Sequence, residues 1–495
     1  MIPLKNTASG MNGIGTQLRS GGPVVRLAPK PFFNGLHTSA SMTQRSSIGL
    51  ATSIRRTLSA ALLGIVAAGV FPGTTQAQGM VQMDPQVQEL VDTVSMENLE
   101  RIVRTLAGFE TRHTLSSMDD PDRGVGAAMD WLVEEWSSYS PRLEVSRECF
   151  TPVPQGRITR HVEVCNIMAV LPGRTARRVY ISGHFDTLAW VTEETEGLWP
   201  ENEHPAPGAN DNASGTAVAM ELARVMAQSG IEFDATLVFI SFGAEEMGLV
   251  GARYHAQRAR ENGIRIDAVL NNDMVGNIES GDGQINATVL QLFAPPPDDS
   301  PARELARYIH RVAGAYLPHH EIRRVAREDR FGRGGDHTPF NNFGFAAIRF
   351  TELMENYSRQ HTPADLPDPM HYPFFLQNAR VNMAVAANLA LAPAAPEVTT
   401  PNGQPRLGRG ASGYDATLQW DAVPGAVSYR VYMRDGWSMD WQRVLDVGNV
   451  TEVSFPGFSI DDSFIGVAAV GPGGHESLVS PYVMVPRNVT EVEVR

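Results

Sequence analysis

Apolar positions in the first part of the chain recur with the period of a helix. Leu99, Ile102, Val103 and Leu106 lie at intervals that place them on one face of a helix, where a core would cover them. The pattern is repeated around Trp131. The spacing predicts helices within residues 84–107 and within residues 124–137.

The middle of the chain alternates between short apolar runs and longer amphipathic ones. The short runs are rich in Val, Ile, Leu and Phe, as strands of a buried sheet are. The expected strands are 177–186, 235–242, 267–273 and 345–350, and the expected helices are 213–228, 249–261, 301–315 and 374–392. This order predicts an α/β domain over residues 84–392, with a doubly wound, mostly parallel sheet and helices on both of its faces.

The pattern changes where the last expected helix ends. Residues 393–408 are rich in Pro, Ala and Thr and are typical of a linker. Residues 409–491 contain short alternating strands, such as 416–420, 428–434 and 464–470, separated by turns with Gly and Pro. This part is therefore predicted to be a small all-β sandwich.

The expected sandwich resembles a fibronectin type III module. Trp420 would be its early core tryptophan, and Tyr429 and Tyr432 would lie on a central strand. Ser463 stands where such modules usually carry a tyrosine. The segment holds no cluster of catalytic residue types, so its role is open between attachment and substrate presentation.

The N-terminal segment differs in composition from the rest of the chain. Residues 1–80 contain seven Lys or Arg and no Asp or Glu. Arg55 and Arg56 precede the apolar run 58–71, which is followed by a small-residue site ending at Ala77. This order predicts an export signal within residues 1–77, and delivery to the periplasm or outside the cell.

Two alternatives remain for this segment. Translation could begin at Met42, because the residues before it fit no ordinary signal. The apolar run could also be a membrane anchor, although its 14 residues are few for crossing a bilayer. We expect no stable membrane insertion after processing.

The charge of the chain excludes one class of partner. The formal charge is −14, and the part after residue 80 holds 34 Lys or Arg against 55 Asp or Glu. A protein that binds nucleic acid needs a basic surface to displace counterions. We therefore expect no nucleic-acid partner.

Cys149 and Cys165 are the two cysteines of the sequence, and both lie in what we expect to be neighbouring strands. An oxidising compartment would allow them to form a disulfide. The alternative is two buried thiols that do not meet, because the sequence does not give the distance between them.

Residues that can bind a metal stand at the ends of the expected strands. His184 and Asp186 end the strand 177–186 on one face, where the carboxylate can accept the second N–H of the imidazole. Asp211 stands just before the helix 213–228. Their ordinary explanations are a structural histidine and a helix cap.

Two adjacent carboxylates, Glu245 and Glu246, follow the strand 235–242. They would repel one another unless a cation or solvent separated them. Because successive side chains at a strand end point in different directions, one can bind a metal while the other faces the water that the metal activates. The alternative is a solvated acidic loop.

Two further candidates complete the set. Asp273 ends the strand 267–273, and His361 lies in a loop rich in Pro and Asp. Doubly wound sheets bind ligands at the edge where such strands end. Each candidate alone has an ordinary explanation, but two histidines and three carboxylates placed together predict a metal site.

These motifs resemble the dizinc aminopeptidase family, which includes bacterial leucyl aminopeptidases. In chain order they read GHFDT, PGANDNASG, FGAEEMGLVG, NNDMVG and HTPADLPD. The resemblance covers about residues 84–392. It implies two Zn²⁺ ions, both bound by Asp211, with His184 and Asp273 completing one site and Glu246 and His361 the other. It also implies Glu245 as general base and a cis peptide bond between Asp211 and Asn212.

Two other segments carry candidates for substrate binding. The run GRGGDHTPF resembles part of the family's substrate-binding wall, which makes Asp336 and His337 candidates for contacting substrate. Residues 349–360 hold Arg349, Glu352 and Glu355 close to His361. They could hold a peptide's amine or carboxylate, and the alternative is a solvated charged loop.

The sequence thus predicts an exported zinc exopeptidase that acts on peptides, most simply an aminopeptidase. A carboxypeptidase or a glutaminyl cyclase on the same fold is the first alternative, since the ligands do not decide which end of a peptide is attacked. An inactive binding or scaffold protein is the second. The sequence does not predict side-chain preference or oligomeric state.

Overall fold

The computed structural model describes residues 81–192, 196–198 and 202–483. The predicted export signal and the last residues of the predicted sandwich lie outside the described residues. Within the part that is described, none of the helices combines the length and the apolar character that crossing a bilayer requires.

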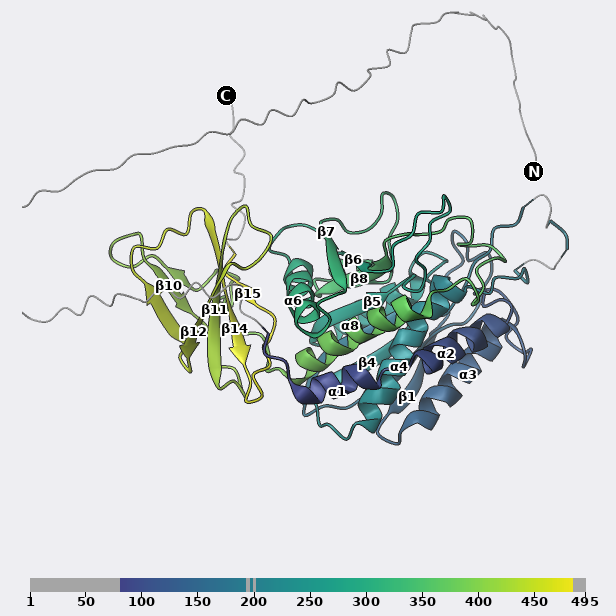
Figure 1. Ribbon diagram of the computed structural model, residues 1–495, viewed down its shortest axis with the longest axis horizontal. Helices are drawn as coiled ribbons and strands as arrows, with labels where there is room; N and C mark the ends of the chain where they lie inside the picture. Colours follow the sequence, from purple (N-terminus) through teal and green to yellow (C-terminus); the bar gives the residue numbers. More distant parts are fainter. Residues whose placement is uncertain (1–80, 193–195, 199–201, 484–495) are drawn as a thin grey trace, which may run out of the picture. The chain divides into compact units, whose positions relative to one another are not determined.

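Among the described residues, the first domain contains eight α-helices and one sheet of eight strands (Figure 1). The helices are α1 (Pro85–Thr93), α2 (Met96–Gly108), α3 (Gly124–Tyr139), α4 (Ser214–Gln228), α5 (Val250–Glu261), α6 (Pro301–Tyr316), α7 (His337–Asn342) and α8 (Tyr372–Leu391). The strands are β1 (Glu144–Phe150), β2 (Val164–Leu171), β3 (Thr175–His184), β4 (Ala235–Phe242), β5 (Ile266–Asn272), β6 (Val289–Phe293), β7 (Glu321–Val325) and β8 (Ala347–Glu352).

The sheet is mixed, with its parallel strands at the centre. Its order is β1-β2-β4-β3-β5-β8-β6-β7. The neighbours β4, β3, β5 and β8 run parallel to one another, and so do β6 and β7, whereas β1, β2 and β4 pair antiparallel. The central strands therefore end at one edge of the sheet. This confirms the predicted α/β fold class.

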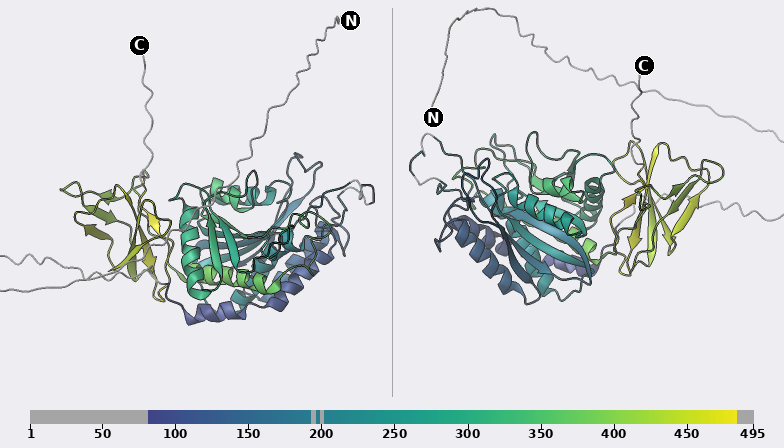
Figure 2. Two further views of the ribbon diagram at one scale, coloured as in Figure 1. Left: turned by 45° about the horizontal axis from the view of Figure 1, so that its top comes forward. Right: turned by 180° about the vertical axis from the view of Figure 1, so that it is seen from behind.

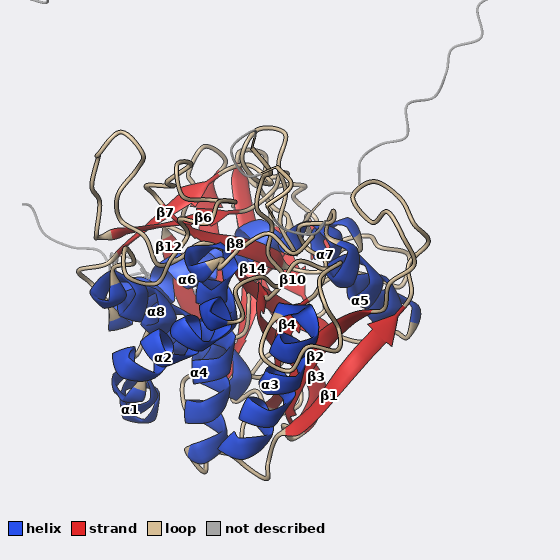
Figure 3. Cartoon of the chain, turned by 90° about the vertical axis from the view of Figure 1, so that its right-hand side faces the viewer, coloured by secondary structure: helices blue, strands red, loops and turns tan. Residues whose placement is uncertain are grey.

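Helices cover both faces of this sheet (Figure 3). Successive side chains of β3 divide between two cores, because Val179 and Ile181 pack with the larger helix layer while Tyr180 packs on the opposite side. The larger layer contains α1, α2, α3, α4, α6 and α8, and the smaller one contains α5 and α7. The strands read as continuous apolar runs because both of their faces are buried.

Short polar signals set where several helices begin. Ser95 accepts a hydrogen bond from the N–H of Asn98 at the start of α2. Ser300 accepts one from the N–H of Arg303 at the start of α6, where Pro301 needs no hydrogen-bond partner for its nitrogen. These caps satisfy N–H groups that the first turn of a helix leaves without acceptors.

The C-terminal module is all-β, as predicted. A sheet of three strands contains β9 (Leu407–Gly408), β10 (Ala416–Gln419) and β13 (Glu452–Phe455), and a sheet of four contains β11 (Ser428–Asp435), β12 (Arg443–Gly448), β14 (Ser463–Val470) and β15 (Ser480–Pro481). Figure 2 shows the two sheets from two further sides. All their pairings are antiparallel. Trp420 and Tyr429 are buried between them, with ring centroids 5.3 Å apart.

Polar contacts join the sandwich to α6. The indole N–H of Trp441 donates to Glu304 at 3.0 Å, and Arg307 donates to the carbonyl of Met439 at 2.7 Å. Tyr432, on the outer face of β11, contacts Arg311 of the same helix. Because Glu304 and Arg307 are buried, these contacts compensate charges that would otherwise be costly.

Candidate metal centre

The predicted metal ligands meet at the edge where β3, β4 and β5 end. His184 is the last residue of β3, Glu246 follows β4, and Asp273 follows β5 directly. Because the three strands are parallel neighbours, their carboxyl ends lie side by side. Asp211 comes from the irregular turn before α4, and His361 from the loop between β8 and α8.

These side chains form two sets that share Asp211. One set contains His184 and Asp273, and the other contains Glu246 and His361. Oδ1 of Asp211 lies 3.3 Å from Nε2 of His184, and Oδ2 lies 3.1 Å from Nε2 of His361. The two oxygens of one carboxylate thus face different histidines, as a ligand between two ions would.

The contact between Glu246 and His361 fits a cation better than hydrogen bonding. Oε1 of Glu246 lies 2.8 Å from Nε2 of His361, yet this buried oxygen has no hydrogen-bond partner within the described chain. A nitrogen and an oxygen can lie this close without a hydrogen bond when the lone pairs of both atoms point at the position of a shared cation. Imidazole nitrogens and carboxylate oxygens are ligands that Zn²⁺ prefers, so the residues present fit zinc.

Glu245 forms a further group of potential ligands with His184 and Glu246, but it does not group with the shared ligand Asp211. Its Oε2 is 3.9 Å from Nε2 of His184, and the side chain is only 11% exposed. Burial raises the pKa of Glu245 well above its usual range, and the negative charges of Glu246 and Asp336 raise it further. A carboxylate with a raised pKa is a better proton acceptor than an exposed one.

The carboxylate of Asp186 fixes the backbone that carries Glu245 and Glu246. Its carboxylate accepts the N–H groups of Glu245 and Glu246, at 2.9 and 3.2 Å, and the hydroxyl of Thr114 at 3.1 Å. Nδ1 of His184 lies 3.1 Å from the carbonyl oxygen of Asp186 but 3.7 Å from its carboxylate. The carbonyl, not the expected carboxylate, therefore orients the imidazole.

Asp365 positions the turn that carries Asp211, and the sequence did not single it out. Its two carboxylate oxygens accept the N–H groups of Asn210 and Asp211, at 3.0 and 2.9 Å. Burial raises the pKa of Asp365 to about 7. The Asp211–Asn212 peptide bond is cis, as the family resemblance implies. The motif HTPADLPD contains Asp365, but its contact spans more than 150 residues of sequence.

The backbone adopts a conformation that side chains disfavour at the ligand His361, beside the ligand Asp273 and beside Glu245. Ala244, Met274 and His361 have φ values of 57°, 58° and 56°. Ala244 precedes Glu245, and Met274 follows Asp273. Non-glycine residues adopt this region at a cost and do so most often at functional sites.

The substrate-wall candidates are buried at the start of α7. Neither carboxylate oxygen of Asp336 has a hydrogen-bond partner among the described residues. Burial raises the pKa of Asp336 well above its usual range, and the charges of Asp186 and Asp273 add to this. Nε2 of His337 donates to the carbonyl of Glu328 at 2.7 Å, so this histidine is held within the protein.

Arg349 and Glu352 do not belong to a loop, so the alternative of a solvated charged loop is wrong for them. Both lie on β8 and are fully buried. Glu352 accepts hydrogen bonds from Asn210 and from the N–H of Asn277. The predicted strand 345–350 stops short of Glu352 because this polar side chain, which is paired inside the core, gives no apolar signal.

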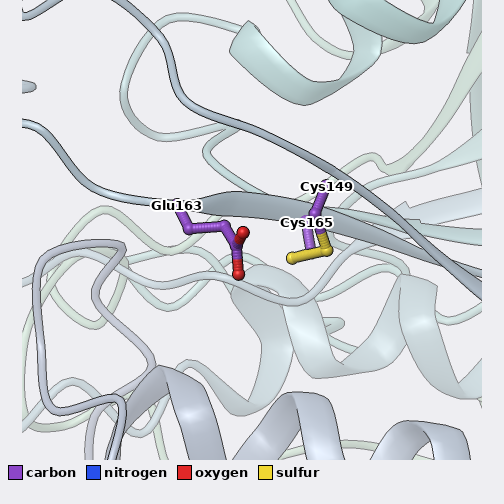
Figure 4. Close-up of side chains that lie close together, drawn as sticks. All are labelled: Cys149, Glu163 and Cys165. Carbon is purple, nitrogen blue, oxygen red and sulfur yellow. A yellow bond between two sulfur atoms is a disulfide. The ribbon is translucent and has the colours of Figure 1, made fainter.

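The one group of potential ligands that lies apart from these, among the described residues, is a disulfide site. Cys149 and Cys165 lie opposite each other on β1 and β2 and are joined by a disulfide, with Glu163 nearby (Figure 4). Zinc binds thiolates, which a disulfide does not provide. The bond closes the loop that carries Arg157.

That loop reaches the metal centre. Arg157 donates to the carbonyl of Glu246 at 2.6 Å, and its guanidinium group lies 5.0 Å from the ring centroid of Trp190. Trp190 is half exposed, and its ring stands edge-on to the ligand His361 at 5.5 Å. The sequence did not indicate either residue, because their contacts join separate loops.

Comparison with known proteins shows which family this chain resembles. Residues 166–386 match the family described as Peptidase family M28. A probable zinc metalloprotease of Pyrenophora teres f. teres is 34% identical over 431 residues, which cover 80% of this chain and 86% of that protein. A similar protein of Leptosphaeria maculans is 33% identical, over 81% of this chain and 97% of its own length.

Solved structures are similar at lower identity. The LapA aminopeptidase of Legionella pneumophila is 20% identical, with a TM-score of 0.49, over 63% of this chain and 76% of its own. A likeness at this level does not bear on the reaction.

Proposed function

The chain belongs to peptidase family M28 and is a zinc metallopeptidase, and from this premise we propose that it is a two-zinc aminopeptidase. One carboxylate oxygen of Asp211 lies near His184 and the other near His361, and this arrangement supports two ions. When bound, zinc would polarise the scissile carbonyl and acidify a water molecule.

Glu245 is placed to move the proton in this reaction. Its carboxylate would accept a proton from the attacking water and deliver it to the leaving amine. Asp186 keeps the backbone of Glu245 and Glu246 in place, so that one side chain binds metal and the other remains free for proton transfer. Exclusion of water by the buried surroundings strengthens these charge interactions.

The observation that carries the aminopeptidase proposal is the carboxylate of Asp336. It is buried near the ligands and lacks a hydrogen-bond partner within the described chain. A buried carboxylate of this kind gains most from a cation that arrives with the substrate. The α-ammonium group of a peptide supplies such a cation.

A panel of blocked substrates tests this proposal. We expect hydrolysis of an aminoacyl-p-nitroanilide with a free amine, and of a peptide amide, but not of the same compounds acetylated at the amine. Cleavage of acetylated peptides that end in a free carboxylate would indicate a carboxypeptidase. Cyclisation of an N-terminal glutamine without hydrolysis would indicate a cyclase, and a protein without stoichiometric zinc or turnover would indicate a scaffold.

We further infer export of the protein and a fibronectin type III-like sandwich. The disulfide between Cys149 and Cys165 supports an oxidising compartment. Trp420 and Tyr429, packed together in the sandwich core, support the second inference. Fractionation of cells that express the full chain, with N-terminal sequencing of the mature protein, tests export; a mature chain that retains residues 1–77 would contradict it.

A further inference from the structure

Arg349 is buried beside the metal centre without belonging to it. It lies on β8, where it pairs with Asn271 of β5, two residues before Asp273. Its side chain is fully buried. A buried guanidinium group is costly unless carboxylates compensate its charge. The partners of Arg349 therefore need an explanation.

The two ends of this guanidinium group hold different carboxylates. Nη2 forms an ion pair with Oδ2 of Asp273 at 3.1 Å. Nη1 donates to both oxygens of Asp329, at 3.0 and 3.2 Å. Because Asp329 is also buried, Arg349 cannot turn away from Asp273 without removing one of the two guanidinium groups that compensate the charge of Asp329, the other being that of Arg330.

This ion pair leaves the other oxygen of Asp273 for a metal ion. Oδ1 lies 3.8 Å from Nε2 of His184, within the set that contains His184, Asp211 and Asp273. Groups behind a ligand fix its orientation and tune its strength as a donor. Arg349 occupies that position behind Asp273.

We propose that Arg349 is a positioning residue that makes Asp273 a one-oxygen ligand and so sets the affinity of the ion held by His184, Asp211 and Asp273. The inference rests on the two-zinc function proposed above. Asp329 compensates the charge of Arg349, so the pair orients the ligand without adding net charge to the centre.

Arg330 offers a matched control on the same network. Its Nε donates to Asp329 at 2.9 Å, and its Nη1 donates to Glu355 at 2.5 Å. Arg330→Met and Arg349→Met both remove a guanidinium group that contacts Asp329. Only Arg349→Met removes a contact to a metal ligand.

The test measures metal affinity, not turnover. Metal-free wild type and both variants are titrated with Zn²⁺ in competition with a chromophoric chelator, which gives one dissociation constant for each ion. For Arg349→Met we expect one constant to rise about 10- to 100-fold and the other to stay unchanged. For Arg330→Met we expect both to match wild type.

Two further measurements identify the affected site. In a His361→Ala background, which disables the other set, Arg349→Met should still weaken the remaining ion. Co²⁺ in place of Zn²⁺ should show an altered visible absorption spectrum in Arg349→Met alone. A merely structural role for Arg349 would leave the coordination spectrum unchanged.

Unchanged constants in Arg349→Met, or equal weakening in both variants, would overturn the proposal. If circular dichroism shows that metal-free Arg349→Met is unfolded, the same zinc titration is carried out on Arg349→Lys. A single ammonium group cannot hold both Asp273 and Asp329, so we expect intermediate weakening, and wild-type affinity would overturn the proposal. A wild type that binds only one ion would contradict the two-zinc function, while the effect of Arg349→Met on that ion still tests Arg349.

Discussion

A substitution of Glu245 should reduce turnover without changing metal binding. Glu245→Gln keeps the size of the side chain but cannot accept a proton at neutral pH. Because Glu245 is not among the five expected zinc ligands, we expect zinc content to match wild type while kcat falls about 10²- to 10⁴-fold. Steady-state kinetics and metal analysis of the same preparation check this. Near-normal kcat would exclude Glu245 as general base.

Asp336 should govern recognition of the substrate amine. Asp336→Asn removes the negative charge but retains the shape of the side chain. Charge-assisted hydrogen bonds contribute about 1.5–3 kcal/mol, so we expect kcat/KM for free-amine substrates to fall about 10- to 100-fold. Zinc affinity serves as the control and should be unchanged. Equal kcat/KM in wild type and variant would contradict this role.

For single residues, the sequence predicted the site residues that end apolar strands. It did not predict the residues that fix the site through hydrogen bonds and ion pairs. His184, Asp273 and Glu246 stand where a buried strand stops, which is a local signal. Asp365 contacts Asp211 across 154 residues of chain and Asp329 contacts Arg349 across 20, and one sequence gives no sign of either contact. The expected hydrogen bond between His184 and the carboxylate of Asp186 was wrong, because the carbonyl that meets His184 depends on the path of the backbone.

The disulfide is the element-scale feature with the clearest expected effect. It joins β1 to β2 across a separation of 16 residues. Closing a loop of that length restricts the unfolded chain and contributes about 3 kcal/mol. We expect Cys149→Ser with Cys165→Ser to lower the free energy of unfolding by about this amount in urea titrations. Wild type unfolded under reducing conditions should match the variant, and identical midpoints for oxidised and reduced protein would contradict the estimate.

Elements were predictable where the apolar pattern is long and both faces are buried. β3, β4 and β5 are such strands, and their positions followed from the sequence. β6 and β7 are five residues each, and β7 is charged and partly exposed, so neither gave a periodic signal. α7 has six residues, too few for a helical repeat.

At the scale of the whole molecule, Glu304 links stability to pH through the contact between α6 and the sandwich. Burial raises the pKa of Glu304 to about 7, although Arg307 and Trp441 oppose this. An unfolded chain would have a glutamate pKa of about 4.3. Between these values the folded protein binds more protons than the unfolded one, so its stability falls as pH rises and levels off above the folded pKa.

Glu304→Gln removes this titration. We expect the variant to lose less stability than wild type between pH 5 and pH 8, with a difference of up to about 3 kcal/mol. Melting temperatures across this range check it. Glu321→Gln, which removes an exposed carboxylate from β7, is the control and should follow wild type. If the melting temperatures of Glu304→Gln and wild type changed in parallel with pH, the proposed link between Glu304 protonation and stability would be contradicted.

The number of zinc ions needed for turnover tests the central claim most directly. Metal-free protein is titrated with Zn²⁺ while bound metal and hydrolysis of a free-amine substrate are followed together. Asp211 faces both histidines, so we expect full activity at two ions per chain and none in Asp211→Ala, which should also lose tight binding of both. Full activity at one ion, or an Asp211→Ala variant that still binds two, would contradict a centre built on a shared Asp211.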